Sequence, residues 1–153
     1  MFRREVNGIL ADYRSGFELS MDGEILALAE TGLENLFRAD LPKYDHENVE
    51  QRVDIAMRKY RRHNASLDER RDAIRDLADV LEFLRPRLQE VMTAKDENDL
   101  FNIANNFGLR HHNDKQKTGY DRSIWYSWMF YYYLATIHAV LPLIRKAEQN
   151  TDA

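Results

Sequence analysis

The chain lacks cysteine altogether. This excludes a disulfide framework, a thiolate nucleophile and cysteine-ligated zinc, and it leaves the redox compartment undetermined. The chain begins with basic residues, but no apolar core or small-residue cleavage site follows them, so this start does not have the pattern of a secretory signal. We therefore expect a cytoplasmic protein whose fold depends on neither disulfides nor metal.

An excess of positive charge is lacking too. The 22 lysines and arginines are outnumbered by 26 aspartates and glutamates, which gives a formal net charge of -4. Proteins that clamp long duplex nucleic acid usually carry a large positive excess. Extensive duplex binding is therefore not expected, and any contact with nucleic acid would have to be local.

Glycine and proline are scarce, with 6 and 3 residues among 153. Residues of high helix propensity dominate, and no stretch shows the sustained alternation typical of strands. The length suits one domain and is too short for two of ordinary size. The sequence predicts an all-α fold: one domain over residues 1–153, a helical bundle of five or six helices, with an N-terminal arm or short helix over 1–20 and a frayed tail over 146–153.

Helix boundaries follow from apolar spacing and capping residues. Ser66 and Glu69, three residues apart, carry the capping-box signature, and apolar residues over 67–91 then recur at a 3–4 spacing. Pro86 lies inside this pattern and predicts a kink or break near Arg85. Helices are expected, in chain order, over 2–13, from Ser20 or Asp22 to Phe37, from Asp45 or Asn48 to Arg62, over 67–91, from Thr93 or Asp96 to Phe107, and over 124–144.

The segment 124–144, "IWYSWMFYYYLATIHAVLPLI", is apolar almost all round and long enough to cross a membrane as a helix. Tyrosine hydroxyls and His138 fall across its middle, however, whereas aromatic residues of membrane helices gather at the two interfaces. We interpret it as the buried, highly aromatic C-terminal helix of the bundle, packed mainly on 67–91, and expect no membrane contact. His138 is expected to be a core or interface histidine. So apolar a helix also predicts a homodimer.

Recognisable catalytic motifs are lacking. The chain has no glycine-rich phosphate loop, no H-E-x-x-H, no G-x-S-x-G and no EF-hand loop. His111 and His112 are adjacent, so on a helix their side chains point in different directions and are not expected to share one metal ion. We expect no metal and no cofactor.

One polar stretch, "NNFGLRHHNDKQKTGYDR" over 105–122, separates two apolar segments. Arginine and histidine together suffice for metal-free RNA cleavage, because one imidazole takes the ribose 2′-OH proton, a second acid protonates the leaving oxygen and arginine stabilises the phosphorane. The alternative is a polar loop in which the arginine pairs with a carboxylate and the histidines are exposed. The candidate catalytic residues are Arg110, His111 and His112, and the candidate binding residues are Asn106, Asn113, Lys115, Lys117 and Tyr120.

The block "DLFNIANNFGLRHHNDKQKT", followed by "IWYSWMFYYYLATIHA", looks like a block of uncharacterised bacterial helical proteins. A helix that ends in an arginine–polar–histidine cluster and precedes a long apolar helix is similar to the HEPN superfamily. The resemblance implies a small helical bundle, often dimeric and RNA-cleaving, of toxin–antitoxin or phage-defence type, with Arg110 in the place of the family's arginine. That family's histidine lies a few residues further on, whereas His111 and His112 follow at once, so an active ribonuclease and a degenerate relative both stay open.

The family's spacing also occurs as Arg58 and His63 in "RKYRRH". This run is the densest basic cluster of the chain, and it either contacts phosphates or forms a solvated helix C-terminus that favourably opposes the helix dipole. The sequence therefore favours two functional hypotheses. One is a HEPN-like RNA-binding or metal-independent ribonuclease-type protein, and the other is a non-enzymatic helical module that recognises a partner protein.

Overall fold

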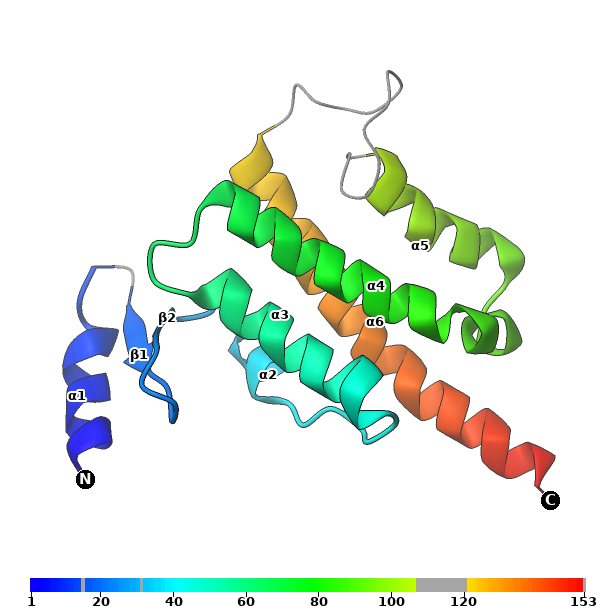
Figure 1. Cartoon of the computed structure of the whole chain (residues 1–153), viewed down its shortest axis with the longest axis horizontal. Helices are drawn as coiled ribbons and strands as arrows, with labels where there is room; N and C mark the ends of the chain where they lie inside the picture. The colour runs from blue at the N-terminus through cyan, green and yellow to red at the C-terminus, as the bar shows by residue number, and fades with distance from the viewer. Residues whose placement is uncertain (15, 31, 107–120, 153) are drawn as a thin grey trace.

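A computed structural model describes residues 1–14, 16–30, 32–106 and 121–152 of the chain (Figure 1). The prediction of a single all-α domain is confirmed: over these residues the chain is helical apart from loops and one two-stranded hairpin. The elements are α1 (Phe2–Ala11), β1 (Phe17–Leu19), β2 (Ile25–Ala27), α2 (Glu34–Arg38), the π-helix η1 (His46–Glu50), α3 (Gln51–Arg61), α4 (Leu67–Val91), α5 (Ala94–Asn106) and α6 (Arg122–Thr151).

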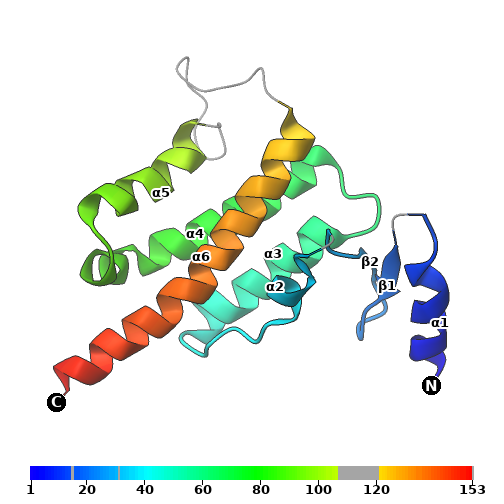
Figure 2. The same cartoon turned by 180° about the vertical axis from the view of Figure 1, so that it is seen from behind.

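The core lies where α4 packs against α3 and α6 (Figures 1 and 2). Helices α3 and α4 form an antiparallel pair, and α6 runs beside α4 in roughly the same direction. The apolar spacing predicted over 67–91 is confirmed over 74–88, where its side chains are fully buried on one face of α4, whereas Leu67 at the start of the helix is 36% exposed. Burial of each such aliphatic side chain contributes about 1.5–3 kcal/mol to the free energy of unfolding. The buried α4 positions at this spacing are Ile74, Leu77, Leu81, Leu84 and Leu88.

The helix starts follow the predicted capping chemistry. The Ser66 hydroxyl accepts the Glu69 backbone N–H at 3.1 Å, and the Glu69 carboxylate accepts the Ser66 N–H at 2.7 Å. Thr93 caps α5 in a similar way by accepting the Asp96 N–H at 3.2 Å. The break predicted near Pro86 does not occur, since α4 continues to Val91. Buried leucines on both sides of the proline offset the backbone hydrogen bond that it removes.

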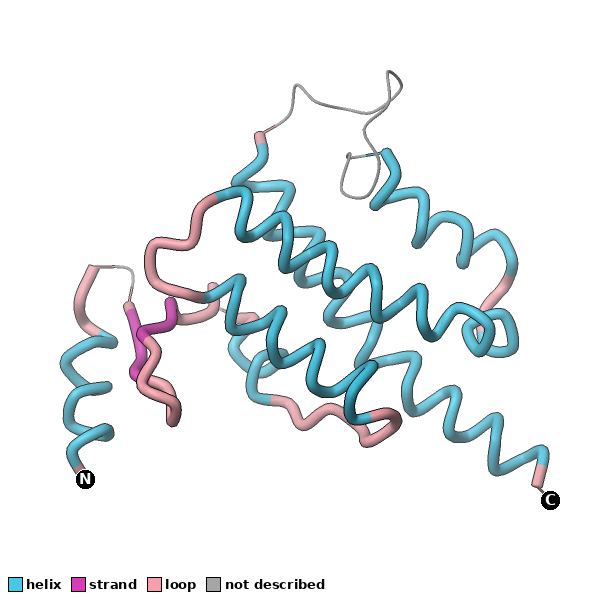
Figure 3. The backbone as a smooth tube through the Cα atoms, in the orientation of Figure 1, coloured by secondary structure: helices cyan, strands magenta, loops and turns pink. Residues whose placement is uncertain are grey.

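The helix predicted from Ser20 or Asp22 to Phe37 is wrong. Strand β2 occupies part of this range and pairs antiparallel with β1, and of the described residues from Ser20 to Phe37 only those of α2 are helical (Figure 3). Met21, Asp22 and Gly23 form the turn, with the Gly23 N–H donating to the Ser20 carbonyl at 3.2 Å and with Gly23 at φ +85°, a conformation that glycine adopts readily. The Ser20 hydroxyl accepts the Glu24 N–H at 3.0 Å and closes the turn.

The helix α6 is buried on one side and exposed on the other. Its core-facing positions include Phe130, Tyr133 and Ile137, so the predicted buried aromatic helix is confirmed for that side. By length and composition alone α6 qualifies as a candidate membrane span, and 50% of that window is buried inside the bundle. The tail predicted to fray beyond Arg145 is instead helical up to Thr151, with an ion pair of 2.9 Å between Arg87 and Glu148.

Candidate functional site

Most of the predicted site residues fall in 107–120, outside the described residues. These are Arg110, His111, His112, Asn113, Lys115, Lys117 and Tyr120. Of the predicted set, Asn106 is described, as the exposed last residue of α5. Beyond 107–120, the Asp121 carboxylate caps α6 by accepting the Ile124 N–H at 3.1 Å. The ribonuclease site and its polar-loop alternative therefore both stay predictions.

The basic cluster of α3 is occupied by carboxylates. Arg61 donates to Glu18 at 2.6 Å and to the Ala27 carbonyl at 2.9 Å, so it holds both strands of the hairpin against α3. Lys59 lies 2.5 Å from Asp76 on α4. These cations therefore serve the fold, and the cluster is poorly suited to bind phosphates.

The second arginine–histidine spacing is used in the same way. The Arg58 guanidinium binds Asp54 and Asp22, and the hydrogen bond that it donates to Asp54 contributes most to raising the pKa of Arg58 above its ordinary value. The His63 ring contacts Phe17 of β1 edge-on, with ring centroids 4.9 Å apart. Both residues attach the hairpin to α3.

An exposed aromatic face lies on α6, formed by Trp125, Trp128 and Tyr132, whose 3–4 spacing puts them on one side of the helix. Their exposed fractions are 40%, 43% and 37%. The rings of Trp128 and Tyr132 are stacked, with centroids 5.4 Å apart and planes 6° from parallel, and Trp125 meets Trp128 edge-on at 5.6 Å. A contiguous exposed aromatic patch of this kind is typical of an interaction surface.

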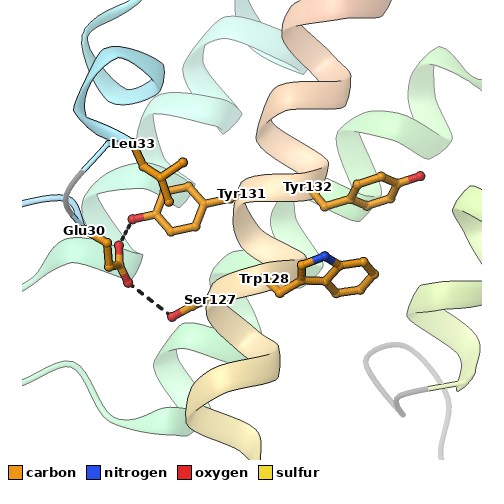
Figure 4. Close-up of a pocket in the computed structure, with 6 residues that line it drawn as sticks. All are labelled: Glu30, Leu33, Ser127, Trp128, Tyr131 and Tyr132. Atoms are coloured by element: carbon orange, nitrogen blue, oxygen red, sulfur yellow. Dashed lines mark hydrogen bonds between the residues drawn. The ribbon is translucent and has the colours of Figure 1, made fainter.

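A pocket of about 380 Å³ adjoins this aromatic face (Figure 4). Tyr131 points toward Glu30 and Leu33 on one side of α6, whereas Trp128 and Tyr132 point toward the other side. The pocket therefore has one wall with a carboxylate and one wall of aromatic rings. A mostly apolar hollow with few polar groups is the usual character of a ligand site. Its lining residues are Glu30, Leu33, Ser127, Trp128, Tyr131 and Tyr132.

Hydroxyl groups hold the Glu30 carboxylate. Tyr131 donates to one of its oxygens, and Ser127 Oγ donates to Oε1 at 3.3 Å. The Tyr60 hydroxyl lies 2.9 Å from Ser127 Oγ. Because the single Ser127 hydrogen is directed to Glu30, Tyr60 must be the donor to Ser127. The carboxylate is thus linked by a chain of hydrogen bonds to the core.

The inner end of this chain of hydrogen bonds is buried in the core. Tyr60 is only 4% exposed, and its ring stacks on Phe130 with centroids 4.0 Å apart. Burial, with a smaller contribution from the Glu30 charge, raises the pKa of Tyr60. The phenol therefore stays protonated at neutral pH and remains a hydrogen-bond donor. A carboxylate oriented in this way is preorganised for a positively charged group.

The sequence contained signals for this site that the helical interpretation overlooked. The Asp22-Gly23 pair is a strong hairpin signal, and recognising it would have taken Glu30 out of the predicted helix. The spacing of Trp125, Trp128 and Tyr132 is compatible with one exposed helix face as well as with burial. Within the described part of the chain, no group of three or more acidic or histidine side chains is placed to hold a metal ion.

Comparison with known proteins adds no relative. The chain matched no protein-family model, no curated protein and no solved structure. The class of protein is therefore the one that its own fold and site define: a small helical domain with an exposed aromatic face and a pocket that carries one carboxylate.

Proposed function

We propose that this protein is a non-enzymatic helical interaction module, which binds a partner protein at the Glu30 pocket and the aromatic face of α6. The observation that carries the proposal is the stacked, exposed pair Trp128 and Tyr132 beside an open apolar pocket. Tryptophan and tyrosine contribute much of the binding energy at protein interfaces, where their rings fill pockets at small entropic cost.

The charge around the site favours a protein partner over RNA. Burial raises the pKa of Tyr132, and the nearby carboxylates Asp99 and Asp96 raise it further. Glu30 adds negative charge on the other side of α6. Phosphate groups would be repelled here, and the basic residues at the C-terminal end of α3 and just beyond it, Arg58, Lys59, Arg61 and Arg62, are already paired with carboxylates.

A selection from random peptides displayed on phage tests the proposal. Selected peptides should bind the wild type, and Trp128→Ala should weaken them about thirtyfold, as expected for a central aromatic residue of an interface. Phe83→Ala is the matched control, because Phe83 is an equally exposed aromatic on α4 that does not line the pocket. The proposal fails if peptides are selected whose affinity is the same for wild type and Trp128→Ala.

The HEPN-like ribonuclease is the second candidate, in its active or degenerate form. Its support is the resemblance of the sequence block, together with the helical elements on either side of 107–120, where α5 ends and the apolar helix α6 begins. RNA cleavage without divalent metal tests it, with wild type compared against Arg110→Ala and His112→Ala. Loss of cleavage in both variants favours the ribonuclease, and equal background in all three favours the interaction module.

A homodimer remains a prediction, and apolar residues exposed on α6 support it. Ile124 is 66% exposed and Leu143 is 48% exposed, so a second copy packed on this helix would remove apolar surface from water. Light scattering at micromolar concentration tests the prediction. A monomer would remove it and would leave the aromatic face to a different partner.

A further inference from the structure

We infer that the partner presents an arginine, whose guanidinium pairs with Glu30 while its aliphatic stem lies along the aromatic wall of the pocket. The inference rests on the proposed function, since it names the chemistry recognised at that same site.

Within the described residues Glu30 has no ion pair, whereas two carboxylates of the hairpin are paired with arginines. Glu18 and Glu24 of the hairpin pair with Arg61, the last residue of α3, and with Arg62, which follows it, at 2.6 and 3.4 Å. Glu30, in the segment that follows the hairpin, has hydroxyl partners but no ion pair within the described residues. A partner that covered this carboxylate with apolar groups would leave a buried charge uncompensated, which is strongly unfavourable. A cationic group removes that cost.

The hydrogen bonds favour arginine over lysine. Ser127 and Tyr131 each donate to one oxygen of Glu30, and a carboxylate oxygen accepts more than one hydrogen bond. The two oxygens are thereby fixed in orientation and still have accepting capacity. A guanidinium fork can donate to both oxygens at once, whereas an ammonium acts as a point charge.

The shape of the pocket suits a long side chain with one charged end. Its carboxylate lies on the side of α6 that faces Leu33, and its aromatic wall of Trp128 and Tyr132 lies on the other side (Figure 4). An arginine side chain combines an aliphatic stem, which packs on apolar surface, with a planar head that pairs with carboxylates. One side chain thus carries a group that matches each wall, which neither a small cation nor a wholly apolar group does.

Three synthetic peptides test the inference: acetyl-Gly-Gly-Arg-Gly-Gly-amide and the same peptide with lysine or with citrulline in place of arginine. Citrulline has nearly the shape of arginine but no charge. The chain has two tryptophans, and both lie on the aromatic face, so their fluorescence reports binding directly. For the wild type we expect a dissociation constant on the order of 1 mM for the arginine peptide, weaker binding of lysine by about threefold, and no saturable binding of citrulline.

Glu30→Gln should weaken binding of the arginine peptide about tenfold, because it removes the charge and keeps an oxygen that accepts the Tyr131 hydroxyl. Glu47→Gln is the matched control: it removes one exposed negative charge from η1, outside the pocket, and should leave binding unchanged. Circular dichroism and thermal melting of each variant establish that it is folded. The citrulline comparison uses the wild type alone and so does not depend on how any variant folds.

The failures of the inference and of the proposed function are distinguishable. Equal binding of arginine and citrulline peptides, no saturable binding of the arginine peptide, or unchanged affinity in Glu30→Gln overturns the arginine inference. If phage-selected peptides still require Trp128 in that case, the interaction module stands with a different ligand chemistry. If no selected peptide requires Trp128, the proposed function fails as well.

Discussion

At the scale of single residues, buried charges are matched by partners placed close to them. Glu97 on α5 is only 5% exposed, and its carboxylate accepts the Arg85 Nε–H at 2.5 Å. The Arg85 guanidinium also lies over the Phe101 ring, 4.3 Å from its centroid. The hydrogen bond to Glu97 raises the pKa of Arg85 above its ordinary value, so the guanidinium stays charged. This contact fastens α5 to α4.

Arg85→Ala should therefore destabilise the protein by about 1–3 kcal/mol, because it leaves the Glu97 carboxylate buried without its cation. Arg71→Ala is the matched control: Arg71 pairs loosely with Asp68 at 3.9 Å on the surface, and its loss should cost less than about 0.5 kcal/mol. Urea unfolding of both variants measures the difference. Equal midpoints for the two variants would show that the Glu97 pair does not stabilise the fold.

His138 predicts a dependence of stability on pH. Burial lowers the pKa of its imidazole below the ordinary value. As the pH falls below the pKa that this imidazole has in the unfolded chain, the unfolded state binds a proton that the folded state does not yet bind. The free energy of unfolding is therefore highest above that pKa and decreases on acidification. Guanidinium unfolding should show that the free energy of unfolding decreases less between pH 7.5 and pH 5.0 for His138→Gln than for the wild type. Equal losses would contradict the burial effect at this residue.

At the scale of helices and strands, the sequence predicted those features that depend on the spacing of residues close together in the chain. The seam of α4 was predictable, because one helical period over 67–91 specifies which face is buried. The hairpin was missed, because strands of three residues are too short to show an alternation and their apolar residues fit a helix equally well. The pocket was beyond local patterns altogether. Tyr131 donates a hydrogen bond to Glu30 although the two residues are 101 positions apart in the sequence, and rules based on local spacing do not predict contacts at that separation.

Two glycines of the hairpin region give a matched test of this correction. Gly16 and Gly23 both have positive φ, at +86° and +85°. A Cβ on Gly23 would meet open space, whereas one on Gly16 would come within 2.8 Å of Leu28 Cδ1 and 3.0 Å of the Ala11 carbonyl. Gly23→Ala should lower the free energy of unfolding by about 1 kcal/mol through backbone strain alone. Gly16→Ala should lower it by about 2 kcal/mol or more, because steric overlap adds to the strain. Thermal melting compares them, and a larger loss at Gly23 would contradict this geometry.

At the scale of the whole molecule, α6 connects core and surface. One side of it forms the core with α3 and α4, and the other carries exposed aromatic rings beside the pocket. The hydrogen-bond chain from Tyr60 through Ser127 to Glu30 joins these two sides, so the stability of the bundle fixes the geometry of the carboxylate. This arrangement is the physical reason to place binding on α6, and it requires no contribution from 107–120.

The most direct test of this account is nuclear magnetic resonance of the two tryptophan indole N–H groups during titration with the arginine peptide. Trp128 lines the pocket and Trp125 lies next to it without lining it. We predict that the Trp128 indole signal shifts saturably and more than that of Trp125, and that Glu30→Gln reduces this shift. Saturable shifts confined to signals away from α6, with both indole signals unmoved, would contradict the claim that the pocket on α6 is the binding site.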